Sequence, residues 1–86
     1  MPQISWSVSN GHFIATSSIP AKTAHLWLAS GKKWTDLGAM TPTAGAPAGT
    51  SFGMAWDGVS PVYAALEYGV GGQTLTLTTD IQLAKK

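Results

Sequence analysis

The chain has 86 residues, of which 44% are hydrophobic and only 10% are charged. Disordered chains are highly charged and poor in aromatic residues, so this composition predicts a folded domain, and the length predicts a single one over residues 1–86. The net charge is +1, with five lysines, no arginine and no cysteine. Phosphate contacts and base readout depend on clustered lysine and arginine, so we expect no nucleic-acid partner.

The chain as given is expected to carry neither a membrane span nor an export signal. No apolar run approaches the roughly 20 residues that cross a bilayer. The first ten residues, MPQISWSVSN, lack the basic and apolar segments of a signal peptide. The chain is therefore expected to work in the cytoplasm or to be cut from a longer exported protein, in which case its place is extracellular or periplasmic. The absence of cysteine leaves the redox compartment undetermined.

Alternation of apolar and polar residues with a period of two predicts an all-β protein. In QISWSVS the apolar residues Ile4, Trp6 and Val8 alternate with polar ones. Asn10-Gly11 is the dipeptide best suited to a two-residue turn, because both turn positions need a positive φ. We therefore expect a hairpin made of residues 3–9 and 12–18.

The next segments predict two further strands and a loop. TAHLWLAS at 23–30 is almost continuously apolar, which is typical of a strand covered on both faces. A turn at Gly31-Lys32 leads into a short strand at 34–40. Residues 41–50 contain only Thr, Pro, Ala and Gly, a composition that predicts a surface loop.

Three strands complete the chain, at residues 51–57, 62–70 and 73–84. Asp57-Gly58 and Pro61 mark one connection, and Gly71-Gly72 marks a hairpin turn. In the last strand the leucines and isoleucine alternate with polar residues, and Thr79 is the one polar residue expected to face inward.

Seven short strands opening and closing with hairpins favour an immunoglobulin-like or fibronectin type III-like β-sandwich, with a small β-barrel as the alternative. The first, second and fifth strands are assigned to one sheet, and the third, fourth, sixth and seventh to the other. Tyr63 stands where such sandwiches often place a corner tyrosine, whose hydroxyl bonds to the backbone upstream.

Residues for catalysis or metal binding are sparse. His12 and His25 are the only imidazoles, and Asp36 and Asp57 are scattered along the chain. We expect no catalytic residue, no metal site and no cofactor, and the protein is predicted not to be an enzyme.

The four tryptophans are the most informative residues. Exposed indoles serve as flat stacking platforms for sugars, which makes glycan binding the sharpest functional hypothesis. Trp6 and Trp56 are in phase with apolar neighbours and are expected in the core. Trp27 alternates with Leu26 and Leu28, so it lies in the core or on a surface that docks another domain.

Trp34, beside two lysines at a turn, is expected to be partly exposed. The hypothetical ligand-binding set is Trp34, Trp27, Lys32 and Lys33. A second hypothetical site is an interaction edge on the outward side of the last strand, made of Thr74, Thr76, Thr78, Asp80 and Gln82. Threonine rows favour strand pairing, and the alternative is a solvated face.

Parts of the chain resemble a known family. The segments HLWLAS and VYAALEYGVGGQTLTLTTDIQL, with the Leu26-Trp27 pair, Trp34, the Ala-rich strand ending at Glu67, and the stretch from Leu77 to Asp80, resemble the C-terminal immunoglobulin-like module of PhoPQ-activated pathogenicity-related proteins. That bacterial family has an α/β-hydrolase-like main body, which this chain lacks. The resemblance implies an accessory module and transfers no catalytic residue.

Three functions are left open. The first is a non-catalytic accessory or interaction module of a bacterial envelope or secreted protein, where "bacterial" and "secreted" follow from the resemblance alone. The second is a carbohydrate-binding module with an exposed tryptophan platform, and the third is a structural unit of a virion or surface assembly. The expected partners are a domain of the parent protein or another protein, and a glycan under the second hypothesis.

Overall fold

The computed structural model describes residues 3–30 and 32–79, and these contain β-strands and connections without a helix. The strands are β1 (Ile4–Ser9), β2 (His12–Ser17), β3 (Thr23–Ser30), β4 (Lys33–Ala39), β5 (Thr41–Pro42), β6 (Ser51–Ala55), β7 (Val62–Val70) and β8 (Gln73–Thr78). All of the pairings between them are antiparallel.

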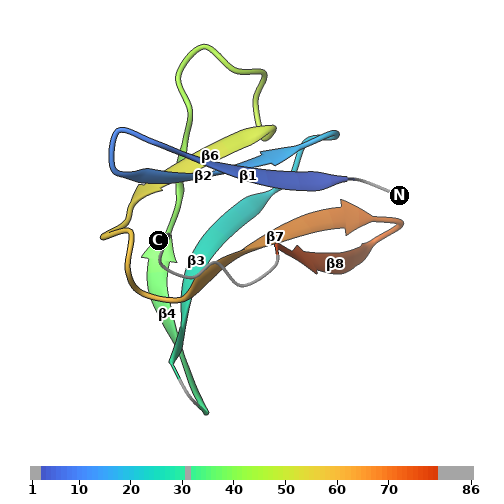
Figure 1. Ribbon diagram of the computed structural model, residues 1–86. Coiled ribbons are helices and arrows are strands. Elements are labelled where there is room, and N and C mark those ends of the chain that lie inside the picture. Colours follow the sequence, from blue (N-terminus) through green and yellow to red (C-terminus); the bar gives the residue numbers. More distant parts are fainter. Residues whose placement is uncertain (1–2, 31, 80–86) are drawn as a thin grey trace.

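The strands form two four-stranded sheets that pack face to face (Figure 1). The first sheet has the order β1-β2-β6-β5 and the second has the order β4-β3-β7-β8. The predicted two-layer all-β architecture is therefore confirmed, together with the assignment of every predicted strand to its sheet. Hairpin β3–β4 extends beyond the layered part of the molecule (Figure 1).

The predicted loop at 41–50 begins with a short strand, which corrects the expectation for this segment. Thr41 pairs with Gly53 and Pro42 with Phe52, so β5 is the edge strand next to β6. Proline lacks an N–H donor but is tolerated at an edge, where one side of the strand needs no ladder partner. A composition of Thr, Pro, Ala and Gly therefore does not exclude two residues of edge pairing.

The predicted hairpin turns have the expected backbone geometry. Asn10 and Gly11 have φ angles of 50° and 75°, and Gly71 and Gly72 have 57° and 80°. Two consecutive residues with positive φ characterise the tight turn whose twist matches the flanking strands. These turns fix the registers of β1–β2 and β7–β8.

The core lies between the two sheets and takes side chains from both. The largest fully buried side chains are those of Phe13, Leu26, Val62, Leu66 and Tyr68. One hydrogen bond joins the sheets directly: the Tyr68 hydroxyl lies 2.6 Å from the Oγ of Ser17. Ser17 Oγ donates to the carbonyl of Ile19, so its proton is committed and the Tyr68 hydroxyl is the donor to Ser17.

Tyr63 does not take the place expected for a corner tyrosine. It lies one residue out of phase with the core residues of β7, so its ring packs on the outer side of the second sheet beside two tryptophans. The buried tyrosine hydroxyl that links distant parts of the chain belongs to Tyr68.

The prediction that Trp6 is a core residue is wrong. The Trp6 side chain points towards the core, and its ring stacks on Phe13 with centroids 5.7 Å apart. The residue is nevertheless 39% exposed. β1 is an edge strand, so only one face of this indole is covered. Trp56 is half-buried, packs edge-on against Phe13 and donates its Nε1–H to the Ser60 carbonyl.

The last strand agrees with its prediction as far as the described residues reach. Leu75 and Leu77 pack against the core, and Thr79 is buried as expected. Thr79 Oγ1 accepts a hydrogen bond of 3.0 Å from the amide of Ala64, which satisfies the inward polar group. The part of the predicted strand from residue 80 to 84 lies outside the described residues.

Candidate functional site

The candidate site lies on the outer face of the second sheet, the side opposite the core. Leu26 of β3 and Leu66 of β7 point into the core. Because side chains alternate along a strand, the residues next to them in sequence point to the outer face. Cross-strand pairs then place the outward residues in rows: Trp27 opposite Tyr63, and Thr23 opposite Glu67. These rows occupy the central strands β3 and β7, so the face is built on the most firmly held part of the sheet.

A β-bulge sets which residues of β4 join this face. Leu26 pairs with Gly38 and Trp27 with Asp36, so Leu37 has no opposite residue on β3. If side chains alternated without a break from the buried Met40, Asp36 would point towards the core. The extra residue, Leu37, reverses the direction of the side chains that precede it in β4. Asp36 and, two residues earlier, Trp34 are consequently directed to the outer face.

Three aromatic rings gather on this face and form the aromatic cluster, defined as Trp27, Trp34 and Tyr63. Tyr63 is 8% exposed, stacks on Trp27 with an interplanar angle of 8°, and meets Trp34 edge-on. Trp34 is 63% exposed. Burial raises the pKa of the Tyr63 hydroxyl above its ordinary value. The buried Tyr63 ring therefore supports the more accessible indoles of Trp27 and Trp34.

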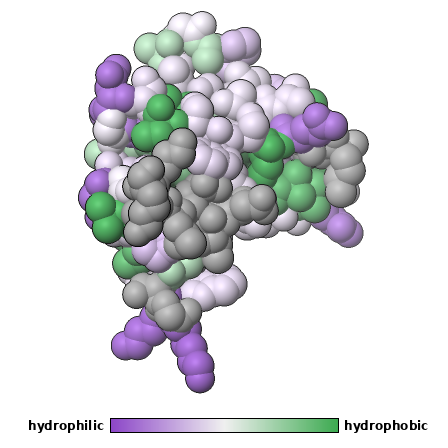
Figure 2. Space-filling view, in the orientation of Figure 1, coloured by the Kyte–Doolittle hydropathy of each residue, from purple (hydrophilic) through white to green (hydrophobic). Residues whose placement is uncertain are grey.

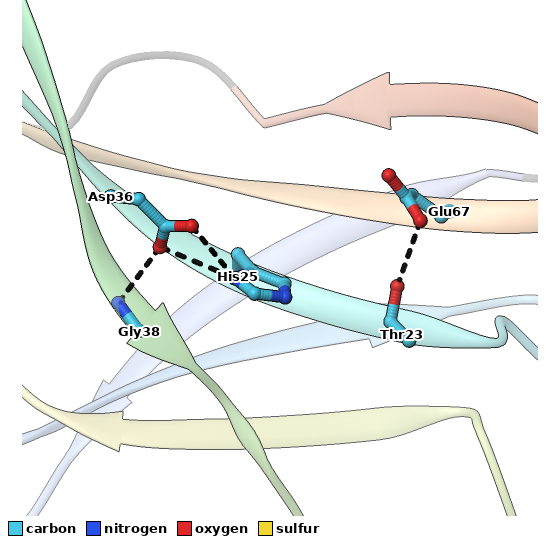
Figure 3. Close-up of polar contacts among 5 residues, drawn as sticks. All are labelled: Thr23, His25, Asp36, Gly38 and Glu67. Atoms are coloured by element: carbon cyan, nitrogen blue, oxygen red, sulfur yellow. Dashed lines mark hydrogen bonds and ion pairs between the residues drawn. The ribbon is translucent and has the colours of Figure 1, made fainter.

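Two polar pairs lie beside the aromatic cluster on the same face. Figure 3 shows these two pairs. His25 Nδ1 lies 3.0 and 3.2 Å from the two carboxylate oxygens of Asp36. The hydroxyl of Thr23 donates to Glu67 Oε1 over 3.2 Å. Both pairs start from β3, and their partners come from β4 on one side and β7 on the other.

The Asp36 carboxylate is held in its ionised form. The amide of Gly38 donates to Oδ1 over 2.8 Å, and this bond, followed by the contact with His25, keeps the pKa of Asp36 below its ordinary value. A carboxylate that only accepts fixes Nδ1 of His25 as the donor, so in the neutral imidazole Nε2 is an acceptor. The neutral imidazole of His25 and the carboxylate of Glu67 can both offer a hydrogen-bond acceptor to a ligand in the hollow.

A shallow hollow of about 130 Å³ lies between these groups. Its lining residues are His25, Trp27, Asp36, Ala65 and Glu67. The small side chain of Ala65 forms its floor, since Ala65 pairs with His25 on one side and with Thr78 on the other. The hollow can accept a protruding group of a ligand but cannot enclose a whole one.

The structure relates the two hypothetical sites to each other. Thr78 pairs with Ala65, Thr76 with Glu67 and Thr74 with Gly69, so the threonine row of β8 continues the face that carries Trp27 and Trp34. The expectation that Trp34 is partly exposed is confirmed. Asp80 and Gln82, the remaining members of the predicted edge, lie outside the described residues.

The two predicted lysines stand apart from this face. Both are exposed at the tip of hairpin β3–β4, where Figure 2 shows strongly hydrophilic side chains. Lys33 precedes Trp34 on β4, so alternation directs it to the other side of the strand. Of the predicted ligand-binding set, the structure brings together Trp27 and Trp34 but not Lys32 and Lys33.

The sequence-based site omitted Tyr63, His25, Asp36 and Glu67. A usable signal was present, because His25 and Trp27 share the same phase on one predicted strand, as do Tyr63 and Glu67 on another. The adjacency of those strands required the strand order of the sheet. The position of Asp36 required the bulge, which no residue pattern in WTDLGAM marks.

Three further kinds of site were sought among the described residues: a metal site, a membrane span and a second groove. No group of three or more His, Asp or Glu side chains is placed to hold a metal ion within residues 3–30 and 32–79. The same residues contain no helix long and apolar enough to cross a membrane. A larger open groove of about 640 Å³, lined mainly by residues of the first sheet such as His12, has no Asp, Glu or Lys side chain among its lining residues.

Comparison with known proteins does not identify a relative of this chain. No protein-family model, no curated protein and no solved structure matches it. Function is therefore inferred from the geometry of the outer face.

Proposed function

We propose that this chain is a non-catalytic accessory module that binds carbohydrate through the outer face of its second sheet. The observation that carries the proposal is the exposed indole of Trp34, which is 63% exposed while edge-on to the buried ring of Tyr63. A sugar ring presents an apolar C–H face that packs on an indole, and a fixed indole loses little entropy when it binds.

The surroundings of the aromatic cluster support the same function. Hydroxyl groups of a sugar need partners, and His25, Asp36 and Glu67 supply charged and neutral polar groups beside the indoles. A flat sheet face with aromatic anchors and polar neighbours gives orientation without an enclosed pocket. The likeness of the strand motifs to an accessory module of bacterial secreted or envelope proteins agrees with a binding role beside a larger body.

Native affinity electrophoresis tests this function. The purified chain is run through gels containing soluble polysaccharides: hydroxyethyl cellulose, galactomannan, laminarin, xylan and polygalacturonate. We expect at least one polysaccharide to retard the chain, and Trp34→Ala to abolish the retardation. Trp34→Phe should retain part of it, because a smaller aromatic platform remains.

The matched control is Trp6→Ala, which removes an exposed indole from the opposite sheet. Its retardation should equal that of the unchanged chain, provided that circular dichroism shows both variants folded. Equal retardation of Trp34→Ala and the unchanged chain would place binding elsewhere. Uniform mobility in every gel would remove the proposed function, and concentration-dependent oligomers in the same samples would favour an assembly unit.

A further inference from the structure

We infer that the ligand of the outer face is a neutral polysaccharide chain that lies lengthwise along the β3–β7 pair, from the aromatic cluster to the threonine row. This inference rests on the proposed function and names its substrate class. It joins the two hypothetical sites, Trp27 with Trp34 and Thr76 with Thr78, into one elongated surface.

The shape of the site favours a polymer over a single sugar. Sites that enclose a small molecule usually have volumes of about 300–1,000 Å³, and the hollow here has about 130 Å³. A monosaccharide would therefore stay largely solvated on this face. A chain gains contacts by extending past the hollow, so the open geometry favours a polymer.

Aromatic and hydrogen-bonding groups follow one another along the strands in an order that suits a chain. The pair of Trp27 and Tyr63 is followed, two residues along β3, by His25 opposite Ala65, and then by Thr23 opposite Glu67. Four residues of strand span about 13 Å, which makes room for more than one sugar ring. The aromatic rings thus lie at one end and the hydrogen-bonding groups Thr23 and Glu67 at the other, with the small side chain of Ala65 between them.

The path along β3 and β7, from Trp27 to Thr23, has a border on one side and at one end. Thr78 and Thr76 border it on β8, beside Ala65 and Glu67 respectively. At the far end Lys22 lies against Gly69, since a Cβ built on that glycine would come within 3.1 Å of Lys22 Cε. The path is therefore bordered by Lys22 at the end away from the aromatic cluster.

The charge of the hollow favours a neutral ligand. Both carboxylates at the hollow, Asp36 and Glu67, face the space that the ligand would fill. Asp36 already accepts from His25 and Gly38, while Glu67 Oε2 has no partner among the described residues. These acceptors match the hydroxyl donors of a neutral sugar and repel the carboxylate of a uronic acid.

The test uses an oligosaccharide ladder. Oligosaccharides from monosaccharide to hexasaccharide, derived from the neutral polysaccharide that retards the chain most, are titrated calorimetrically against the unchanged chain and two variants. Glu67→Gln and Thr76→Val remove groups at the far end, and Thr16→Val is the matched control from an exposed position on the first sheet. Polygalacturonate oligomers form the anionic arm.

We expect affinity to rise with length over several sugars and then to level off. Glu67→Gln and Thr76→Val should each lower the affinity for the longest oligomer about tenfold, as loss of one hydrogen bond implies, while leaving the shortest binder unchanged. Thr16→Val should change neither, and polygalacturonate oligomers should bind at least tenfold more weakly than neutral ones of equal length.

Two kinds of failure are distinguishable. Binding that depends on Trp34 but does not increase with length, or that is insensitive to both far-end variants, would overturn the lengthwise chain and leave carbohydrate binding in place. Equal affinity for polygalacturonate would overturn the neutral class. Absence of any polysaccharide binding would overturn both the inference and the proposed function.

Discussion

Asp57 shows how one carboxylate organises a connection between strands. Its Oδ1 accepts from the amides of Val59 and Ser60 over 2.8 Å, and its Oδ2 accepts from the Ser60 hydroxyl over 2.6 Å. The Ser60 bonds, with that of Val59, keep the pKa of Asp57 below its ordinary value of 3.8. The Ser60 carbonyl, in turn, accepts from the indole of Trp56, so this turn also fixes the half-buried ring at the end of β6.

We predict that the free energy of unfolding decreases in acid because of Asp57. A pKa that is lower in the folded state means that the unfolded chain binds protons more readily, so the contribution of Asp57 is present above about pH 4 and is lost as the pH falls through the folded pKa. Asp36 acts in the same direction. Urea unfolding of the unchanged chain between pH 6 and 2 should show decreasing stability, and Asp57→Asn should decrease less steeply. An identical slope in the variant would contradict this account.

At the scale of elements, the segment between β5 and β6 is anchored at Gly49. Its carbonyl accepts from the amide of Ala21, and a Cβ at this glycine would lie 2.7 Å from the Ala21 carbonyl oxygen. Gly49 also has a φ of +77°, which side-chain-bearing residues rarely adopt. Gly45 has a comparable φ of +87° but no atom within 4 Å of its Cβ position.

These two glycines give a controlled comparison. Gly45→Ala should lower the free energy of unfolding by about 1 kcal/mol, the order of the cost of the left-handed conformation alone. Gly49→Ala should cost at least about 1 kcal/mol more, because the backbone of Ala21 must also move. Urea denaturation of both variants measures the difference. Equal costs would show that the contact with Ala21 relaxes freely.

The strands themselves could be predicted from the sequence because two local signals agree. Period-two alternation and turn dipeptides such as Asn10-Gly11 indicate strands and hairpins without reference to the rest of the chain. β5 was not predicted, since two residues of edge pairing depend on β6 being nearby rather than on Thr41-Pro42 itself. The exposure of Trp6 was missed for a related reason, because alternation reports which way a side chain points and not whether β1 is an edge.

The candidate site could be predicted only in part. Trp34 was identified from its position at a turn beside lysines, and Trp27 from its phase opposite Leu26 and Leu28. His25 and Asp36 come together through a register shift, and Tyr63 lies under Trp34 through the order of three strands. Such properties depend on tertiary pairing, which no spacing within one segment encodes.

At the scale of the whole molecule, the two sheets share one core. Buried side chains from both sheets belong to a single cluster, and the Tyr68 hydroxyl bonds to Ser17 across the interface. A domain of this size is marginally stable, so neither sheet is expected to persist without the other. The molecule should therefore unfold as one cooperative unit.

The tryptophans allow this to be measured sheet by sheet. The variant Trp6→Phe/Trp56→Phe leaves indoles only on the second sheet, and Trp27→Phe/Trp34→Phe leaves them only on the side of the first. Within each variant, the urea midpoint from fluorescence should coincide with the midpoint from far-ultraviolet circular dichroism. Separate midpoints would show that the sheets unfold independently.

The bulge in β4 bears on how the length of this chain can vary. Leu37 has no opposite residue on β3, so a chain lacking one residue at this point would close into a regular strand with Trp34 and Asp36 still facing outward. Loss of Thr35 with the bulge retained would instead turn Trp34 towards the core side. Deletion of one residue is therefore neutral for the outer face at Leu37 and reverses the direction of Trp34 at Thr35 when the bulge is kept, which makes the length of β4, as well as its residues, a determinant of this face.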